Sequence, residues 1–174
     1  MTTKDRAHIF QINASDGGVP KLPLHSAEVT TLGLATDRQR NMKVHGGPER
    51  ALCLFSLERI IALQAEGHSI YPGSIGENVT IAGLEWSQVR PGVRLRLGEE
   101  VLLEITSYTV PCQNIRHSFA GEDFSRVSPK KYLGWTRVYA RVLRPGRIRI
   151  GDVVALVSAQ GILRSEDSAQ NDKV

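Results

Sequence analysis

Apolar and polar residues alternate in short segments along most of the chain, and turn residues separate these segments. A period of two residues is typical of half-buried antiparallel strands, and evenly spaced short strands favour a barrel or a sandwich. The pattern therefore predicts a mainly β fold. The expected strands are His8–Ile12, Ala27–Leu32, Ala51–Phe55, Asn78–Ile81, Val93–Leu97, Val101–Tyr108, Trp135–Leu143, Arg147–Ile150 and Val153–Val157.

One segment has a clear helical pattern. Ser56 is suited to cap the first turn of a helix over Leu57–Glu66, and Gly67 is suited to end it in a left-handed conformation. The expected apolar stripe consists of Leu57, Ile60, Ile61 and Leu63. A second, shorter helix is expected over Ile115–Phe119.

Two segments lack a regular pattern. Asp16–Pro23 contains two glycines and two prolines, which predicts a loop. Beyond Val157 the residues are polar and aperiodic, which indicates a frayed tail over residues 158–174. Since 174 residues are enough to bury one core, we expect residues 1–157 to form a single domain.

The chain contains no uncharged apolar run of the roughly 18 residues that a membrane span needs, and its first residues are charged. We therefore expect a soluble, cytoplasmic protein without membrane contacts. The formal net charge is only +4, but residues 124–151 contain eight Lys or Arg and no acidic residue. The distribution of charge is thus more informative than its sum.

The two cysteines lie in different local sequences. Cys53 is flanked by leucines in "RALCLFSL", which favours a small hydrophobic residue of the core. Cys112 lies in "YTVPCQNIRH", directly after a proline that ends a predicted strand. Strand-end loops present reactive side chains, and Arg116 and His117 are expected to favour the thiolate. Cys112 is therefore the candidate reactive cysteine, although a cysteine without a chemical role in a polar turn would have the same local sequence. The expected compartment argues against a disulfide with Cys53.

The segment "DRQRNMKVHGGPER", residues 37–50, combines basic side chains with a Gly-Gly-Pro break. Glycines can expose consecutive backbone N–H groups as an anion-binding concavity, and arginine binds phosphate or carboxylate with two prongs. The segment therefore predicts an anion cradle, although a solvated basic turn would have the same composition. Its candidate donors are Arg38, Arg40, Lys43, His45, Gly46, Gly47 and Arg50.

A second basic region follows from the alternation of residues 135–143. Arg137, Tyr139 and Arg141 are expected on one face of the strand. This face is open to three interpretations: a solvated exterior, a wall of the anion pocket, or a nucleic-acid surface. Aromatic residues make up only 6% of the chain, which gives little support to a surface that stacks bases.

Five segments resemble stand-alone bacterial members of the MOSC domain family, named after the C-terminal domain of molybdenum cofactor sulfurase. They are "DRQRNMKVHGGPERALCLFS", "PGSIGENVTIAGL", "RPGVRLRLG", "VPCQNI" and "GWTRVYARVLRPGRIRIGD". The resemblance extends from about Phe10 to Val157, and the order and spacing of HGGP, GEN and PC are its most specific part. It implies a MOSC-type β-barrel with a few short helices and one reactive cysteine, matched here by Cys112.

The resemblance also implies a cofactor. In family members that bind molybdenum cofactor (molybdopterin), this cysteine is a ligand of molybdenum and basic residues hold the pterin phosphate. A thiolate is a soft ligand suited to such a metal. Cys112 is then both the catalytic residue and the metal ligand. The candidate cofactor-binding residues are Arg38, Lys43, His45, Gly46, Gly47, Arg50, Glu77, Asn78 and Asn114, of which Glu77 and Asn78 can pair with the edges of a pterin ring.

Three functions follow from these observations. The leading one is an oxidoreductase that reduces small N-hydroxylated or N-oxide substrates, with electrons from a separate donor protein because the chain has no ferredoxin-like cysteine cluster. A second is a sulfur carrier, in which Cys112 holds a persulfide received from a pyridoxal-phosphate-dependent cysteine desulfurase. A third, with little support, is a nucleic-acid-binding barrel that uses the basic residues of 126–149.

Overall fold

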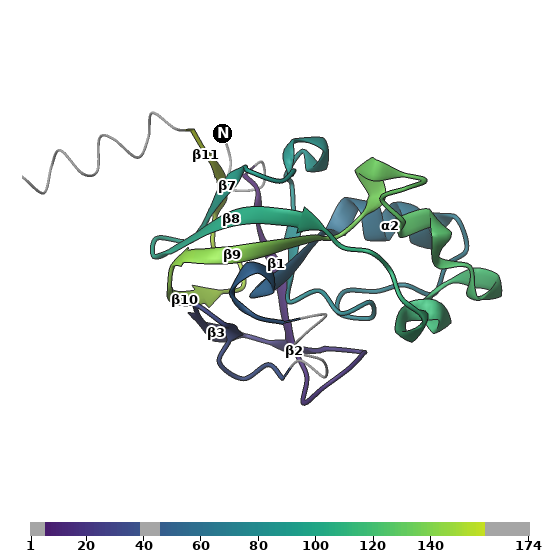
Figure 1. Ribbon diagram of the computed structural model, residues 1–174, viewed down its shortest axis with the longest axis horizontal. Coiled ribbons are helices and arrows are strands. Elements are labelled where there is room, and N and C mark those ends of the chain that lie inside the picture. Colours follow the sequence, from purple (N-terminus) through teal and green to yellow (C-terminus); the bar gives the residue numbers. More distant parts are fainter. Residues whose placement is uncertain (1–5, 39–45, 159–174) are drawn as a thin grey trace, which may run out of the picture.

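The computed structural model describes residues 6–38 and 46–158 and is mainly β (Figure 1). In this part of the chain the strands form one sheet of eight and one of three. The larger sheet has the order β11-β7-β8-β9-β5-β6-β1-β2, and the smaller has the order β10-β3-β4. The strands are β1 (His8–Ala14), β2 (Leu22–Leu24), β3 (Ser26–Thr30), β4 (Gly33–Leu34), β5 (Leu52–Ser56), β6 (Val79–Ala82), β7 (Arg94–Leu97), β8 (Val101–Tyr108), β9 (Val138–Arg144), β10 (Gly146–Arg149) and β11 (Val154–Val157).

The expected barrel is present only in part, because no continuous ladder closes the larger sheet among the described residues. The sheet nevertheless curls until its two ends meet. His8 forms an isolated antiparallel bridge with Val153, and the Ile9 N–H donates to the Asp152 carbonyl over 2.9 Å. The first half of β1 thus contacts the residues just before β11, and the exposed apolar side chains Phe10 and Val153 lie at this seam.

The centre of the larger sheet is a parallel pair. β5 leads into α2 (Leu57–Ala65), and the chain returns as β6 beside β5 with Leu54 opposite Val79. Every residue of β5 and of β6 is buried, as in parallel strands that are covered on both faces. This explains why residues 51–55 form an unbroken apolar run, and it places Cys53 at the middle of the fold.

Helix α2 begins and ends as the sequence predicts. The Ser56 hydroxyl accepts a hydrogen bond from the Arg59 N–H, and Gly67 has a φ of 96°. The expected apolar stripe is wrong at one position. Ile60 and Leu63 are fully buried, whereas the side chain of Ile61 is 54% exposed.

The boundaries of several expected elements differ. The predicted loop Asp16–Pro23 ends in a strand, since β2 starts at Leu22 and pairs with β1. The expected strand Trp135–Leu143 starts only at Val138, because Leu133–Trp135 forms a turn of 3₁₀ helix. The short helix expected over Ile115–Phe119 is a 3₁₀ helix, η4 (Gln113–Ser118). The other described 3₁₀ segments are η2 (Pro48–Arg50), η3 (Trp86–Gln88), η5 (Ala120–Glu122) and η6 (Phe124–Val127).

The loop before β6 is held by a buried carboxyl group. Glu77 Oε1 accepts hydrogen bonds from the Gly73 N–H (2.7 Å) and the Thr80 hydroxyl (3.1 Å). Gly73 has a φ of 88°, and a Cβ there would lie 2.4 Å from the Lys21 carbonyl oxygen. The loop therefore depends on glycine at this position. Burial raises the pKa of Glu77, and its Oε2 has no hydrogen-bond partner in the described structure.

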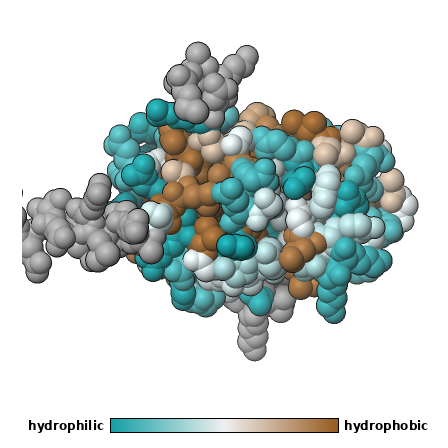
Figure 2. Space-filling view, turned by 90° about the horizontal axis from the view of Figure 1, so that it is seen from above, coloured by the Kyte–Doolittle hydropathy of each residue, from teal (hydrophilic) through white to brown (hydrophobic). Residues whose placement is uncertain are grey.

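Hydrophobic patches lie between hydrophilic areas on the face of the molecule that Figure 2 shows. No helix within residues 6–38 and 46–158 is long and apolar enough to span a bilayer.

Two adjacent isoleucines of α2 test the packing of this helix. Ile60→Ala should lower the free energy of unfolding by about 2–5 kcal/mol, because it removes a fully buried side chain. Ile61→Ala, the matched control, should change it by less than about 0.5 kcal/mol. Urea unfolding of both variants measures the difference, and equal losses would contradict the described orientation of α2.

The buried carboxyl of Glu77 predicts a pH dependence of stability. The pKa of Glu77 is raised in the folded state, so its favourable contribution is fully present below about pH 4 and is lost as the pH rises through the folded-state pKa. Glu77→Gln keeps an oxygen for Gly73 and Thr80 but cannot ionise. In urea unfolding, the stability of the variant relative to the original protein should therefore increase as the pH rises above about 4, until the pH exceeds the raised pKa of Glu77. A stability difference that does not change with pH would show that Glu77 has an ordinary pKa.

Candidate functional site

A pocket with a volume of about 100 Å³ opens where several strand ends and loops converge. Its walls come from the turn between β1 and β2, the segment after β4, strand β5, the loop before β6, the loop after β8, and the start of β9. The lining residues are Gly18, Val19, Lys21, Arg38, Cys53, Ile75, Gly76, Asn78, Val110, Cys112, Asn114, Ile115, Arg137 and Tyr139.

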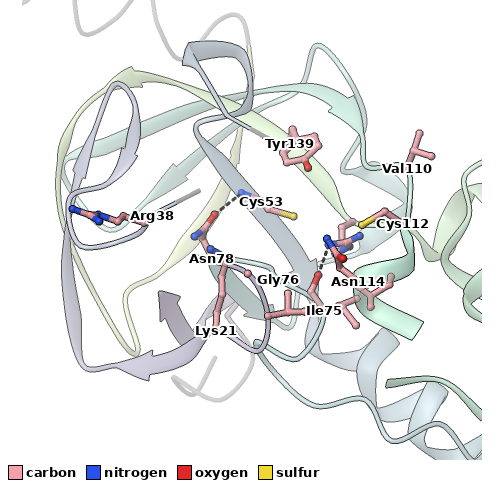
Figure 3. Close-up of a pocket in the computed structure, with 14 residues that line it drawn as sticks. Lys21, Arg38, Cys53, Ile75, Gly76, Asn78, Val110, Cys112, Asn114 and Tyr139 are labelled. Atoms are coloured by element: carbon pink, nitrogen blue, oxygen red, sulfur yellow. Dashed lines mark hydrogen bonds between the residues drawn. The ribbon is translucent and has the colours of Figure 1, made fainter. Parts of the chain in front are cut away.

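Both cysteines line this pocket, and both are free thiols. Cys112 is half-buried on the loop after β8, and Cys53 is buried on β5. Figure 3 shows the two sulfur atoms pointing toward one another across the pocket. The expectation that Cys53 is buried is confirmed, but its side chain belongs to the same pocket as the candidate reactive cysteine.

The surroundings of Cys53 keep its thiol protonated. Burial raises the pKa of the Cys53 thiol, and the nearby Arg137 charge opposes this effect only in part. Cys53 Sγ lies 3.9 Å from the Thr109 hydroxyl oxygen. Tyr139 lies beside both sulfurs. The pKa of its phenol is raised to about 12, mainly because the side chain is buried and to a smaller extent because of the two cysteines.

Arg137 is a buried cation of the pocket wall. Its Nη1 donates a hydrogen bond to the Ile75 carbonyl oxygen, and only 6% of the residue is exposed. None of the ion pairs of residues 6–38 and 46–158 includes Arg137. A buried charge without a carboxylate partner costs several kcal/mol, and an anionic ligand would offset this cost.

Lys21 is the second buried cation, and it is paired. Its Nζ lies 2.6 Å and 2.7 Å from the two carboxylate oxygens of Asp37. The same carboxylate accepts hydrogen bonds from the Ser15 N–H and from Asn78 Nδ2, both over 2.8 Å. Asn78 Oδ1 in turn accepts from the Cys53 N–H over 3.0 Å (Figure 3). One network thus joins the β1–β2 turn to the strand that carries Cys53.

The structure brings some predicted site residues together and separates others. Arg38, Asn78 and Asn114 line the pocket with Cys112. Arg38 is exposed, points away from the cysteines in Figure 3, and lies 3.4 Å from an Asp16 oxygen at the surface. Asn78 uses its amide for the hydrogen bonds described above and does not present a free edge to a pterin.

Only part of the predicted glycine cradle lies within the described residues. Of this part, Gly46, Gly47 and Arg50 do not line the pocket. Gly47 precedes η2, and the Arg50 guanidinium lies 5.5 Å from the centre of the ring of Tyr139, a lining residue. The predicted donors Arg40, Lys43 and His45 lie outside the described residues.

Glu77 is expected to contact a pterin, whereas Arg116 and His117 are expected to favour the reactive thiolate. All three have other partners in the structure. Glu77 is fully buried in the loop before β6 and does not reach the pocket, so its carboxyl group holds backbone and not a pterin edge. Arg116 and His117 follow Cys112, but both lie beside Glu122, with Arg116 Nε 3.6 Å and His117 Nδ1 3.4 Å from its carboxylate oxygens.

The basic face of β9 is divided between the pocket and the surface. Arg137 and Tyr139 line the pocket, which agrees with the interpretation as a pocket wall. Arg141 instead pairs with Glu104 and Glu49. Farther along the basic run, Arg126 pairs with Glu66 and packs on Trp135. Several cations of this run are thus neutralised by carboxylates from distant parts of the chain.

Lys21 and Asp37 are the site residues that sequence reasoning missed. Lys21 lies in an aperiodic loop, and Asp37 precedes the basic segment, so no periodic signal oriented either side chain. Charged residues follow Asp37 in the sequence, so no local pattern indicated that its side chain is only 3% exposed. The described residues contain no group of three or more His, Cys, Asp or Glu that could hold a metal ion by themselves. A metal at this site would therefore depend on a thiolate and on ligands that come with a cofactor.

Comparison with known proteins places this geometry in a family. A family model for the MOSC domain matches residues 41–155. The protein YiiM of Escherichia coli is 30% identical over 146 residues, which cover 81% of this chain and 63% of YiiM. The uncharacterized protein YflK of Bacillus subtilis is 29% identical over 143 residues, with the same two shares. The chain thus matches less than two thirds of the length of these relatives.

A fungal relative and solved structures extend the comparison. A protein named "Reductase" from Gibberella moniliformis is 30% identical over 118 residues, 65% of this chain but 20% of that protein. The crystal structure of YiiM from Geobacillus stearothermophilus has a TM-score of 0.66 at 24% identity and covers 87% of this chain and 75% of its own. The YuaD protein of Bacillus subtilis has a TM-score of 0.67 at 17% identity, covering 85% and 93%. The match of the family model to residues 41–155, well over half of the sequence, shows that this chain belongs to the MOSC domain family.

Proposed function

We propose that this protein binds molybdenum cofactor in the described pocket and reduces small N-hydroxylated or N-oxide substrates. The observation that carries the proposal is the combination in one pocket of a half-buried thiol, Cys112, with Arg137, a buried cation that belongs to none of the ion pairs of the described residues. A soft sulfur suits molybdenum, and a buried guanidinium without an ion-pair partner suits a phosphate or an oxoanion. The printed name of the fungal relative agrees with reductase chemistry.

The residues present fit such a cofactor. Cys112 would provide the sulfur ligand, and Arg137 and Lys21 would provide the positive field for the anionic groups. Gly76, with a φ of 92°, lies in the wall, where a Cβ would come within 3.8 Å of Arg137 Nη1. The tighter neighbour of such a Cβ would be Val19 Cγ1 at 3.0 Å, so this part of the wall is built for glycine. When bound, the cofactor would supply the two-electron redox chemistry that cleavage of an N–O bond requires.

The chain's own residues would hold the reactants and their charges. Lys21 is fixed by Asp37, so its ammonium group is pre-positioned and loses little rotamer entropy on binding. The phenol of Tyr139 keeps its proton at neutral pH because its pKa is about 12. Its hydroxyl can therefore only act there as a neutral hydrogen-bonding group. Two electrons and two protons are needed to convert an N-hydroxyl group to an N–H and water, and we propose that a separate donor protein supplies the electrons.

A second candidate function is favoured by the position of Cys112. This residue is only half-buried and lies on a loop that lines the pocket, where a pyridoxal-phosphate-dependent cysteine desulfurase could transfer sulfur to it. In this function Cys112 would carry a persulfide. The two functions differ in a simple observable: the reductase needs bound molybdenum and pterin, whereas the carrier gains about 32 Da, one sulfur atom, on Cys112.

Nucleic-acid binding receives no support from the described structure. Arg126, Arg141 and Arg147 of the basic run each have a carboxylate partner, and Arg137 is buried. We expect no salt-dependent binding of oligonucleotides.

Replacing Cys112 tests the metal ligand. In protein from a host that makes molybdenum cofactor, Cys112→Ser should lose bound molybdenum and turnover of an N-hydroxylated purine or an amidoxime. The reason is that a hard, protonated hydroxyl replaces a soft thiolate. Metal and pterin analysis, turnover with an artificial reductant and a thermal melt give the three readouts.

Gln113→Ala is the control for Cys112→Ser, because Gln113 is an exposed neighbour that does not line the pocket. It should retain metal and turnover. Absence of molybdenum and pterin from the original protein, or full turnover in Cys112→Ser, would refute the proposed function.

Arg137, directly before β9, and Arg141 of β9 test the anion site. Arg137→Gln should weaken cofactor retention by about one to two decades, because a charge-assisted hydrogen bond contributes roughly 1.5–3 kcal/mol. Arg141→Gln removes the same charge four residues later, at a surface ion pair, and it should leave retention unchanged. The fraction of bound pterin after dialysis measures both. Equal retention in the two variants would show that the guanidinium of Arg137 does not hold the anion.

A further inference from the structure

We propose that Cys53 is the second sulfur of the pocket, and that it receives the sulfane sulfur which Cys112 accepts at the surface. The pocket would then hold an internal sulfur relay, from an accessible cysteine to a sheltered one. This inference rests on the second candidate function, the sulfur carrier, and adds to it the destination of the sulfur within the protein.

The first argument is geometric. The two sulfurs point toward one another across the pocket in Figure 3, with Tyr139 beside both. The free thiols are not joined in a disulfide. A persulfide on Cys112 extends that side chain by one sulfur atom into the space between the two residues. The outer sulfur, and not Cys112 Sγ itself, is then the atom that Cys53 meets.

The second argument is the difference in access. Cys112 lies on a loop between Pro111 and η4 and is half-buried, so a donor can reach it. Cys53 is only 5% exposed and lies on β5, between β6 and β9. A bulky donor cannot reach Cys53 directly. Sulfur can therefore reach Cys53 only through the pocket, where Cys112 lies.

The transfer is a thiol exchange without net oxidation. Cys53 Sγ attacks the outer sulfur of Cys112–Sγ–SH, a bond forms between Cys53 Sγ and that sulfur, and the Cys112 Sγ–S bond breaks. Cys112 leaves as a thiolate and takes up the proton that Cys53 released. The products are the Cys112 thiol and the Cys53 persulfide, so that atoms, charge and electrons balance with no further reagent.

Burial disfavours an anion at Cys53, and the Arg137 cation offsets part of this cost for the product. A hydropersulfide is a stronger acid than the thiol from which it forms, so its anion benefits more from a nearby cation. Arg137 supplies this cation, as its effect on the Cys53 thiol indicates. The Thr109 hydroxyl, 3.9 Å from Cys53 Sγ, can donate to the anion. Burial also protects the terminal sulfur from thiols in solution.

The experiment locates the sulfur after incubation with glutathione persulfide, an anionic and bulky donor. Samples are quenched over time in denaturant with iodoacetamide, digested with trypsin and analysed by mass spectrometry. The two cysteines fall in separate peptides, because Arg50 and Arg59 flank Cys53 while Arg96 and Arg116 flank Cys112. A persulfide adds about 32 Da to its peptide.

In the original protein the added sulfur should appear on the Cys112 peptide first and then on the Cys53 peptide. In Cys53→Ser, and in Cys53→Ala as a second variant, it should remain on Cys112. In Cys112→Ser neither peptide should gain sulfur. Thermal melts of all variants verify that they are folded.

Three results would overturn the relay. If sulfur stays on Cys112 in the original protein, the carrier function stands but the transfer does not occur. If Cys53 gains sulfur in folded Cys112→Ser, the donor reaches it directly and Cys112 is not an obligatory first acceptor. If neither cysteine of the original protein gains sulfur, the carrier function fails together with the relay.

Discussion

The pocket depends on the buried carboxylate of Asp37. It accepts hydrogen bonds from Lys21 Nζ, the Ser15 N–H and Asn78 Nδ2. Asn78 Oδ1 in turn accepts a hydrogen bond from the Cys53 N–H. Three segments that are far apart in the chain are thereby fixed to one another. Removal of this carboxylate would leave a buried ammonium group without a partner, which is far more costly than loss of a surface ion pair. The same contact fixes the Lys21 ammonium group beside the pocket, whereas Arg137 forms no ion pair among the described residues.

The central parallel pair explains how a cysteine in a core strand reaches a functional pocket. β5 and β6 are buried on both faces, and α2 connects them on one side of the sheet. The other side of β5 faces the space that the loop after β8 and the start of β9 enclose. Cys53 and Tyr139 are opposite one another in the β5–β9 ladder, so their side chains emerge on the same face. The pocket is thus a gap in the packing over the sheet, and Cys53 of the fully buried strand β5 lies in its lining.

Charge is organised differently inside and outside. On the surface, Arg141, Arg126 and Arg147 lie beside glutamates from other elements, and such exposed pairs contribute little to stability. The pocket wall carries the positive charges of Lys21 and Arg137, of which Lys21 pairs with the buried carboxylate of Asp37, while the raised pKa of Glu77 favours its neutral form. The pocket thus has an excess of positive charge, which is the arrangement expected for a site that binds an anion.

Local sequence determined the strand pattern, the limits of α2 and the exposed loop position of Cys112, because periodicity, capping residues and proline act over a few residues. The resemblance to MOSC proteins likewise rested on contiguous motifs. Only the tertiary structure decided which side chains meet. Lys21 and Asp37 lie in aperiodic segments, yet their side chains form a buried ion pair. Glu77 accepts a hydrogen bond from the loop before β6, and Arg50 lies over the Tyr139 ring. No local sequence pattern predicts any of these contacts. The position of Cys53 shows the reason most clearly. An apolar run predicts that a strand is buried on both faces. Whether one of these faces contacts packed side chains or a pocket depends on residues that are distant in the sequence, such as Thr109, which lies 56 residues after Cys53.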